Sequence, residues 1–509
     1  MGSRIARTGL VVLALTAAMG RPADATWSII IVDARTREVG IASATCVAGG
    51  DLRLISPVVL VGVGAAAAQA TVPFTATLRQ IIRDQMNLGT DPAQILQILA
   101  KQDSGHQVRQ YGIVDVSGRA VGFSGQWTLS WTGHLTGRIG TYHYAIQGNL
   151  LTGYPVIEKA EDAIRLTPGD LAARLMAAMQ AARAMGGDGR CSCPGHPTGC
   201  GSPPKQFQKS AHIGFMIVTR EGDTDGVCNM TSGCANGAYY LNLNVAAASP
   251  GLPDPVVQLQ SMFSNWRNTW VNRPDHMHSR CTFAPTTIPA DGRSATTATL
   301  VLRDWQGIPL NTGGAKVTVT LDPASPATVT PGNVIDRRDG TYTFPVTAGT
   351  TSGPAVLRVT VHDGKGSVLL SPRTILPVLP LSLEASRASI SAASGGTVIF
   401  DLTPGPAHAT RPFVLAASAS GSSPGIPVGP QTTIPLNPDP LLNLAMVLAN
   451  SPILPGSAGT IDAAGKARAR LAAPAGFLSA LRGATLTFAF GLFGPLDYAS
   501  NSVAVRVLP

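Results

Sequence analysis

The chain has 509 residues, of which 44% are hydrophobic, 13% charged and 5% aromatic. Its 55 glycines and 39 prolines favour β-rich domains with many turns and exclude a coiled coil or a long helical bundle. The formal net charge is +9, but the basic residues do not cluster and aromatic residues are few, which argues against a nucleic-acid-binding protein. At roughly 100–200 residues per domain, this length predicts about three domains.

Residues 1–25 have the pattern of a secretory signal peptide. Basic residues precede a short apolar run over residues 9–20, and Ala23-Asp24-Ala25 provides an Ala-x-Ala cleavage site. The apolar run is too short to cross a bilayer as a helix, and we expect no transmembrane segment elsewhere. We therefore expect a secreted protein, periplasmic or extracellular, whose mature chain begins at Thr26.

Residues 26–284 mix strand and helix patterns. The predicted strands cover Thr26–Asp33, Glu38–Cys46, Val58–Val63, Gln110–Val116, Arg119–Ser124, His212–Thr219 and Tyr239–Val245. Apolar residues at helical spacing predict helices over Thr75–Met86, Pro92–Ala100, Pro155–Arg165, Pro168–Met185 and Asp254–Arg267. Thr167 and Pro168 are the expected N-cap and first residue of the fourth helix. Strands joined by hairpins, then helices, then strands again favour an α+β layered sandwich over a doubly wound sheet.

From residue 285 onward the sequence shows no helical periodicity. Short β-branched runs separated by Gly, Pro and Asp predict an all-β sandwich over residues 285–378. The run Leu376-Pro377-Val378-Leu379-Pro380 predicts a stiff linker. A second β-rich block fills residues 379–509, so we expect one mixed domain followed by two β-sandwich domains.

The seven cysteines agree with export. Six lie in polar, Gly/Pro-rich segments and favour disulfide bonds, with 15 possible pairings: Cys191, Cys193, Cys200, Cys228, Cys234 and Cys281. A zinc site built from Cys191, Cys193, Cys200 and His196 is the alternative, although Cys-x-Cys spacing and an oxidising compartment argue against it. Cys46 lies in an apolar segment, where we expect a buried free thiol.

Cleavage after Ala25 would leave Thr26 at the N-terminus of a hydrophobic strand. A terminal threonine has a nucleophilic hydroxyl, and its own α-amine, with a pKa of roughly 7.7–8.0, can accept the hydroxyl proton. Signal peptidases tolerate almost any residue after the cut, so the position alone does not establish catalysis. The one G-x-S-x-G match, Gly421–Gly425, lies in the C-terminal β-rich block without the strand and helix that a nucleophile elbow needs. No phosphate-binding, dinucleotide or H-E-x-x-H motif occurs, so we expect no cofactor.

Seven ordered segments carry a resemblance across residues 26 to about 265. They are Thr26–Asp33, Gly62–Gln69, Arg109–Asp115, Trp131–His134, Ile146–Gly153, Gly186–Arg190 with Lys209–Ala211, and Pro253–Val256. Together they resemble the domain of unknown function 1028 family, which is placed in the N-terminal nucleophile (Ntn) hydrolase superfamily. The resemblance implies an αββα sandwich with a threonine at the start of its first strand. In family members without a signal peptide that threonine follows the initiator methionine, so two processing routes leave it terminal.

The remaining site residues are assigned by role. Gln69 and Asn149 are candidate donors to the oxyanion of a tetrahedral intermediate, with hydrogen bonding within turns as an equal alternative. Asp188 is a candidate to orient the α-ammonium group or to bind substrate, with an ordinary helix-terminal loop as the alternative. We expect Asp33 to form a turn and His134 to make a structural hydrogen bond.

Two features depart from the family pattern. Some members carry a basic residue where this chain has Cys46, so no lysine that lowers the pKa of the nucleophile or its amine is evident there. The Cys-rich stretch Cys191–Pro204 interrupts a matching block, and we expect it to form a stapled loop near the rim of the active site.

The C-terminal half resembles accessory modules. Pro289–Pro309 and Asp339–Phe344 resemble parts of bacterial invasin-type Ig-like domains, and residues 381–509 resemble a β-rich module of secreted bacterial proteins, on the strength of Gly405–Pro412 and Asp462–Gly465. We expect these modules to space or attach the N-terminal domain at a cell surface or an extracellular polymer.

These observations predict a secreted hydrolase that acts on an amide bond of a small amide or peptide substrate. The expected site residues are Thr26, Gln69, Asn149 and Asp188, with no metal ion. The alternative is a non-catalytic binding or surface-attachment protein with an inactive Ntn-like domain. The missing basic residue and the Ig-like modules favour that alternative.

Overall fold

The computed structural model describes residues 26–71, 75–196, 198–247, 251–429 and 432–509. The chain divides into two compact units, Met1–Val271 and Asn272–Pro509. The predicted signal peptide lies outside the described residues. The division falls before the expected boundary at residue 284, because β11 (Arg280–Ala284) pairs with β13 (Ala295–Val301) of the second unit.

Two antiparallel sheets form the centre of the first unit. The larger sheet has the order β10-β9-β2-β1-β8-β7 and the smaller one the order β3-β4-β5-β6. The strands of the larger sheet are β1 (Thr26–Asp33), β2 (Glu38–Thr45), β7 (Gly133–Ile139), β8 (Tyr142–Asn149), β9 (Ile213–Thr219) and β10 (Leu241–Val245). Those of the smaller sheet are β3 (Pro57–Leu60), β4 (Gly64–Ala70), β5 (Arg109–Asp115) and β6 (Ala120–Ser124).

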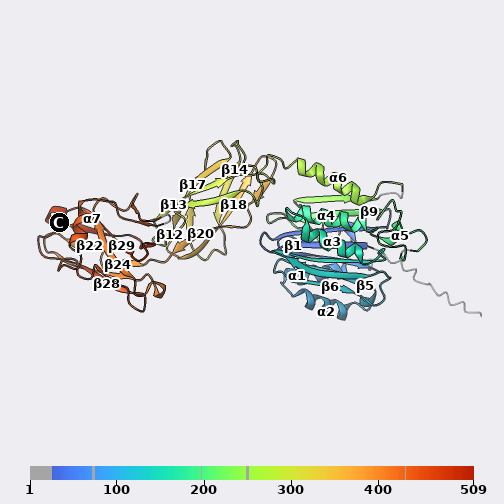
Figure 1. The fold of residues 1–509 in the computed structure, drawn as a ribbon, viewed down its shortest axis with the longest axis horizontal. Helices are drawn as coiled ribbons and strands as arrows, with labels where there is room; N and C mark the ends of the chain where they lie inside the picture. The colour runs from blue at the N-terminus through green and yellow to red at the C-terminus, as the bar shows by residue number, and fades with distance from the viewer. Residues whose placement is uncertain (1–25, 72–74, 197, 248–250, 430–431) are drawn as a thin grey trace, which may run out of the picture. The chain divides into compact units, whose positions relative to one another are not determined.

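Helices cover the outer face of each sheet (Figure 1). The helices on the smaller sheet are α1 (Thr77–Asn87) and α2 (Pro92–Gln102). Those on the larger sheet are α3 (Pro155–Leu166), α4 (Leu171–Ala184) and α6 (Pro255–Asn268). A single turn, α5 (Gly189–Ser192), follows α4. The layers follow the order helix, sheet, sheet, helix, which confirms the predicted αββα sandwich.

Alternation along β1 assigns its side chains to two different interfaces. Ile31 pairs with Gly40, where a Cβ would lie 2.4 Å from Leu171 Cδ2 of α4, so this face of β1 meets the helices. The even-numbered residues of β1, beginning with Thr26 and Ser28, lie on the opposite face and therefore face the smaller sheet. The hydrogen bond from Ser28 Oγ to Gln69 of β4 agrees with this assignment.

Some predicted elements of the first unit are shifted or were missed. Helix α4 begins at Leu171 rather than Pro168, because Asp170 rather than Thr167 is its N-cap and accepts from the Ala173 amide. The strand β4 is nearly all alanine, a residue with low β propensity, and was not predicted. Strands β7 and β8 were not predicted either.

The described part of the second unit is almost entirely β, and its two main hydrophobic cores each lie between two sheets. The first core lies between the sheets β11-β13-β17-β15 (with β16) and β12-β20-β18-β14 (with β19). Their remaining strands are β12 (Ile288–Pro289), β14 (Lys316–Leu321), β15 (Val329–Pro331), β16 (Ile335–Asp336), β17 (Thr341–Ala348), β18 (Gly353–His362), β19 (Ser367–Leu369) and β20 (Thr374–Leu379). The predicted linker at residues 376–380 is wrong, since most of it lies in β20, which pairs with β12 and β18.

The second core lies between the sheets β21-β23-β28 and β22-β31-β29-β24-β27 (with β30). Their strands are β21 (Leu383–Ala385), β22 (Ser389–Ser391), β23 (Gly396–Leu402), β24 (Pro412–Ser418), β27 (Ala458–Thr460), β28 (Ala467–Ala473), β29 (Thr485–Leu492), β30 (Tyr498–Ala499) and β31 (Val503–Leu508). A small hairpin joins β25 (Ile426–Pro427) and β26 (Thr433–Ile434). Helix α7 (Pro440–Val447) corrects the expectation of no helix after residue 285. Its apolar residues surround the helix, so no helical periodicity marks it in the sequence.

Candidate functional site

The start of β1 lies in a buried cluster of amide and hydroxyl side chains. Thr26 pairs with Thr45 of β2 on one side and with Asn149 of β8 on the other. Gln69 and Gln110 reach this cluster from β4 and β5 of the smaller sheet. We call the set the inter-sheet polar cluster, and all of its members are buried: Thr26, Ser28, Ser43, Thr45, Gln69, Gln110, Gln147 and Asn149.

Backbone carbonyls fix the orientation of Gln110 at the centre of the cluster. Gln110 Nε2 donates to Gly133 O at 3.0 Å and to Gly148 O at 2.9 Å. Because a carbonyl oxygen can only accept, the Gln110 Oε1 atom must point the other way. It accepts from Gln69 Nε2 at 2.8 Å and from Asn149 Nδ2 at 3.2 Å.

Gln69 holds the first peptide group of β1. Its Nε2 atom donates to Thr26 O at 2.7 Å as well as to Gln110, and its Oε1 atom accepts from Ser28 Oγ at 2.6 Å. An amide nitrogen carries two hydrogens, and both are used here. Gln69 therefore positions Thr26 and has no donor left for a substrate oxygen, unlike the predicted oxyanion donor.

Asn149 retains hydrogen-bonding capacity next to Thr26. Its Nδ2 atom uses one hydrogen on Gln110, and its buried Oδ1 atom has no partner within the described part of the chain. Side chains of directly paired residues on antiparallel strands lie on the same face, close to each other. Asn149 is thus placed to serve a group on Thr26, either as acceptor or with its second N–H.

A narrow pocket opens beside Thr26. It is lined by Thr26, Thr45, Val47, Leu52, Ile55, Ser56, Ala68 and Gln69. The pocket has room for little more than one water molecule, and Thr26 is only 2% exposed. The hydroxyl of Ser56 is buried and has no hydrogen-bond partner among the described residues, so the pocket contains an unused donor.

Asp188 is fully buried and its carboxylate is saturated. Its Oδ2 atom accepts from the Cys46 amide at 2.6 Å and from Arg190 Nη2 at 2.9 Å. Its Oδ1 atom accepts from the Arg190 amide at 3.0 Å and from Arg190 Nε at 3.1 Å. Burial raises the pKa of the Asp188 carboxyl, and the hydrogen bonds from Arg190 and Cys46 oppose that shift. Asp188 thus positions Arg190 and the end of β2, with no free oxygen for an α-ammonium group.

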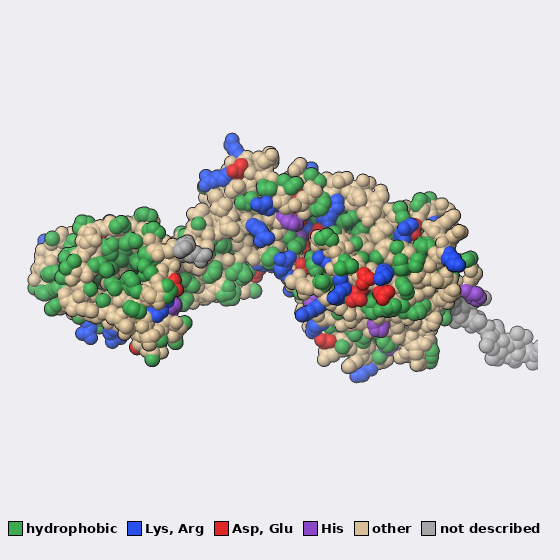
Figure 2. Space-filling model, in the orientation of Figure 1, with side chains coloured by type: hydrophobic (Ala, Val, Ile, Leu, Met, Phe, Trp, Pro, Cys, Tyr) green, Lys and Arg blue, Asp and Glu red, His purple; other side chains and the backbone are tan. Residues whose placement is uncertain are grey.

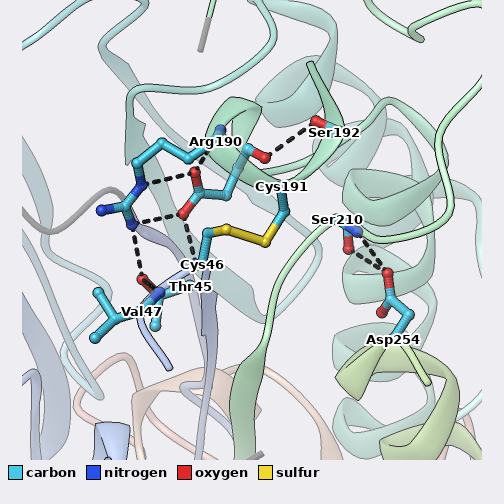
Figure 3. Close-up of a disulfide and its surroundings, with 9 residues drawn as sticks. Thr45, Cys46, Val47, Arg190, Cys191, Ser192, Ser210 and Asp254 are labelled. Carbon is cyan, nitrogen blue, oxygen red and sulfur yellow. Dashed lines mark hydrogen bonds and ion pairs between the residues drawn. A yellow bond between two sulfur atoms is a disulfide. The ribbon is translucent and has the colours of Figure 1, made fainter. Parts of the chain in front are cut away.

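Arg190 extends this ion pair toward the pocket. Its Nη2 atom lies 3.3 Å from Thr45 Oγ1, and Thr45 lines the pocket and pairs with Thr26 (Figure 3). This chain has Cys46 at the position where the family resemblance suggests a basic residue. The structure nevertheless places the guanidinium group of Arg190, from α5, at the edge of this pocket. Arg190 lies in the matched segment Gly186–Arg190, but nothing in its spacing indicates that it contacts β2.

Three disulfides form, and two of them hold the segment around Arg190. They are Cys46–Cys191, Cys193–Cys200 and Cys228–Cys234, with Cys281 as a free thiol. The predictions that Cys46 is free and that Cys281 is bonded are wrong. Cys46 directly follows β2 and lies beside α5, where it bonds to Cys191 (Figure 3). The alternative zinc set is not assembled, since Cys191, Cys193 and Cys200 are oxidised.

Two of the structural roles predicted from sequence are confirmed. Asp33 forms a turn by accepting from the Arg35 amide at 2.9 Å. His134 Nδ1 lies 3.0 Å from Ser124 Oγ, which is a structural hydrogen bond between β7 and β6. Sequence reasoning missed Ser56 and Gln110. Gln110 lies in a matched segment, whereas no pattern marks Ser56.

The chain is similar to proteins of two kinds. Residues 26–194 match the model of the Family of unknown function (DUF1028), and residues 275–371 match that of invasin, domain 3. These matches confirm the resemblance to the DUF1028 family over residues 26–194 and the resemblance to invasin-type domains over residues 275–371. No curated protein matches the chain.

The chain is also similar to solved structures, at low sequence identity. A Silicibacter pomeroyi protein with the DUF1028 family model is 18% identical and covers 47% of this chain and 88% of its own, with a TM-score of 0.35. The Yersinia pseudotuberculosis adhesin InvE is 21% identical and covers 45% of this chain and 58% of its own, with a TM-score of 0.17. Invasin, a bacterial integrin-binding protein, is 16% identical over 59% of this chain and 46% of its own, with a TM-score of 0.18.

The disulfides and the invasin domain 3 match fit a secreted or surface-exposed protein. Among the described residues, no helix is both long enough and apolar enough to span a bilayer.

Proposed function

We propose that the first unit is an amide hydrolase whose nucleophile is the hydroxyl of Thr26, made N-terminal by removal of residues 1–25. The observation that carries this proposal is the position of Thr26 at the first residue of a central strand, with its carbonyl held by Gln69 at 2.7 Å inside a buried polar cluster. The family match also begins at Thr26, the residue that the expected cleavage would expose.

The proposed reaction uses two groups of one residue. Thr26 Oγ attacks the carbonyl carbon of the substrate amide, and its proton passes to the Thr26 α-amine and then to the leaving nitrogen. The C–N bond breaks and leaves an ester on Thr26. Water hydrolyses this ester, releases the carboxylic acid and restores the hydroxyl. The proposed substrate is a small amide or peptide, which needs more space beside Thr26 than the pocket offers.

The neighbouring residues would divide the remaining tasks. The hydroxyl of Ser56, which has no partner among the described residues, and the second N–H of Asn149 are suited to stabilise the oxyanion. Asn149 Oδ1 is suited to accept from the α-amine. Arg190 brings a positive charge to Thr45, beside Thr26, which favours the neutral form of the amine. Asp188 and Gln69 act as positioning residues.

The second unit would bring this hydrolase to its place of action. The invasin domain 3 match supports attachment or spacing at a cell surface or an extracellular polymer through β-sandwich modules. The small size of the pocket beside Thr26 favours the rival function, a binding protein with an inactive first unit.

Substitution of Thr26 tests whether the first unit is a hydrolase or an inactive binding protein. The secreted wild type, Thr26→Ala, Thr26→Ser and a variant with one glycine inserted before Thr26 are assayed against acyl amides, dipeptides and cell-wall fragments. We expect Thr26→Ala and the extended variant to lose activity, because one lacks the nucleophile and the other the free amine. The loss should fall mainly on kcat, by roughly 10²–10⁴-fold for the missing base. Thr26→Ser should retain part of the activity, whereas equal activity in a folded Thr26→Ala protein would contradict the proposal.

A further inference from the structure

The C-terminal module, which we define as the β-sandwich from β21 to β31 (residues 383–508), contains a large apolar cavity. No part of the proposed hydrolase uses this cavity. Its volume is ≈ 340 Å³. The cavity lies between the two sheets of the module, with Leu471 of β28 on one side and Leu486 and Phe488 of β29 on the other. Helix α7 and the 3-10 turn Ser479–Leu481 cover it. The cavity is therefore an opening into the sandwich core and not a surface dent.

The mouth of the cavity is apolar and exposed. Leu444 and Phe477 line the cavity and are each 48% exposed, and Val447 at the end of α7 is 81% exposed. Figure 2 shows hydrophobic side chains gathered in the region of the molecule that holds α7. Exposed apolar groups that surround a cavity mark a binding site for an apolar ligand rather than ordinary surface variation.

The lining selects the class of ligand. Every residue that lines the cavity is Ala, Pro, Leu, Ile or Phe, so the side chains offer no hydrogen-bond donor or acceptor. A peptide backbone inserted here would lose its hydrogen bonds to water without replacement, at a cost of several kcal/mol per group. A hydrocarbon chain loses nothing on entry. An apolar cavity of about 150 Å³ already binds benzene, so this larger cavity has room for a longer chain.

The cover of the cavity is held in place before any ligand binds. Asp439 is the N-cap of α7 and accepts from the Leu442 amide at 2.8 Å. Its other oxygen accepts from Ser418 Oγ, the Ala419 amide and the Ser420 amide at 2.7–2.9 Å. These bonds tie α7 to the end of β24, so little conformational entropy is lost when the cavity fills.

We propose that this cavity binds one aliphatic chain of a fatty acid or lipid, with its polar head left in solvent at the mouth beside α7. The site is independent of Thr26, so the C-terminal module contributes lipid binding whether or not the first unit is a hydrolase.

Binding of free fatty acids tests the proposal with the full secreted chain. Octanoate, decanoate, dodecanoate and tetradecanoate, each below its micelle concentration, are titrated by calorimetry, and the stoichiometry is read by native mass spectrometry. We expect one fatty acid per chain, with each added pair of methylenes tightening Kd by about tenfold until the cavity is full. Absence of binding, or binding with no dependence on chain length, would overturn the proposal.

Two variants locate the site. Ala480 lines the cavity and is exposed, so Ala480→Trp should obstruct the mouth without disturbing the core and weaken dodecanoate binding by at least tenfold. Leu508→Asp, at the exposed end of β31 and outside both the lining and the mouth, is the matched control and should leave dodecanoate binding unchanged. Undiminished binding in a folded Ala480→Trp protein overturns the proposal.

Phosphatidylcholine vesicles distinguish a free fatty acid from a membrane lipid as the source of the chain. Flotation with vesicles that Leu508→Asp keeps and Ala480→Trp loses, together with dodecanoate binding lost only in Ala480→Trp, identifies the bilayer as the source. Dodecanoate binding without flotation identifies the free acid. Flotation without dodecanoate binding, or dimerisation that Ala480→Trp abolishes, shows that the surface serves another contact and overturns the proposal.

Discussion

Gln69 is the residue on which the geometry of the candidate site depends most. It makes hydrogen bonds to Thr26 O, Gln110 Oε1 and Ser28 Oγ, all within 2.6–2.8 Å and all buried. At about 1 kcal/mol for each hydrogen bond lost, Gln69→Leu should lower the free energy of unfolding by about 3 kcal/mol. Ser56→Ala removes a buried hydroxyl that has no hydrogen-bond partner among the described residues. This substitution should change the free energy of unfolding by less than about 0.5 kcal/mol.

Urea denaturation of the two variants and the wild type measures this difference. If Ser56 acts on the oxyanion, Ser56→Ala should also lower kcat by roughly 10²–10³-fold while the protein stays folded. A large loss of stability in Ser56→Ala would show instead that its hydroxyl is part of the fold.

The candidate site could be predicted from the sequence only in part. Thr26 and Asn149 occupy matched segments, and the structure brings them together as cross-strand neighbours. The roles of Gln69 and Asp188 could not be predicted, because they depend on which hydrogen bonds are already taken. The position of Ser56 in the pocket and the contact of Arg190 with Thr45 could not be predicted either. Both depend on segments that are distant in the sequence and meet only in the folded chain, so no local pattern indicates them.

Among the elements, the Cys46–Cys191 disulfide joins the end of β2 to α5 across 145 residues of sequence. The Cys193–Cys200 disulfide spans only 7 and serves as the control. In the chain-entropy account a cross-link stabilises more when it closes a longer loop. We expect the double variant Cys46→Ala/Cys191→Ala to lose about 5 kcal/mol of unfolding free energy, and Cys193→Ala/Cys200→Ala about 2 kcal/mol. Urea denaturation of both under non-reducing conditions checks this order, and equal losses would contradict it.

The cap of α7 should make the C-terminal module sensitive to acid. Partial burial raises the pKa of the Asp439 carboxyl, but hydrogen bonds from Leu442, Ser418 and Ser420 outweigh it and lower the pKa to about 2. Since the pKa is lower in the folded state, this stabilisation is complete above the unfolded value of about 3.9 and is lost as the pH falls toward 2.

The test compares Asp439→Ala with the wild type in urea at pH 7 and pH 3. At pH 7 the variant should lose about 1 kcal/mol, the usual effect of removing an N-cap, and the difference should shrink at pH 3. A difference that grows on acidification would exclude the ionised carboxylate as the stabilising form.

At the scale of the whole molecule, each sheet of the described residues lies within one of the two units. We therefore expect heating to produce separate unfolding transitions. Ile146→Ala, in the core of the first unit, should shift only one transition, by an amount that corresponds to about 2–5 kcal/mol. Phe400→Ala, in the C-terminal core, should shift another. Differential scanning calorimetry measures both, and a common shift of all transitions would contradict independent unfolding.

The fold was easier to predict than the site because it depends on local patterns. The strand pair Thr26–Asp33 and Glu38–Thr45 and the helices that begin at Pro92 and Pro155 are observed where hydrophobic periodicity predicted them, to within a residue or two. The prediction failed where a segment does not alternate between apolar and polar residues, as in the alanine-rich β4 and the almost uniformly apolar α7. It also failed at residues 376–380, where Pro377 lies inside a paired strand, β20.

The free N-terminus of Thr26 is the central claim, and terminal peptide mass spectrometry of the secreted protein tests it most directly. The protein is first treated with a threonine-directed electrophile such as a β-lactone. We predict that the mature chain begins Thr26-Trp27-Ser28 and carries one adduct, an ester on the Thr26 hydroxyl. A chain that begins at any other residue, or one that begins at Thr26 and remains unmodified, would contradict the account.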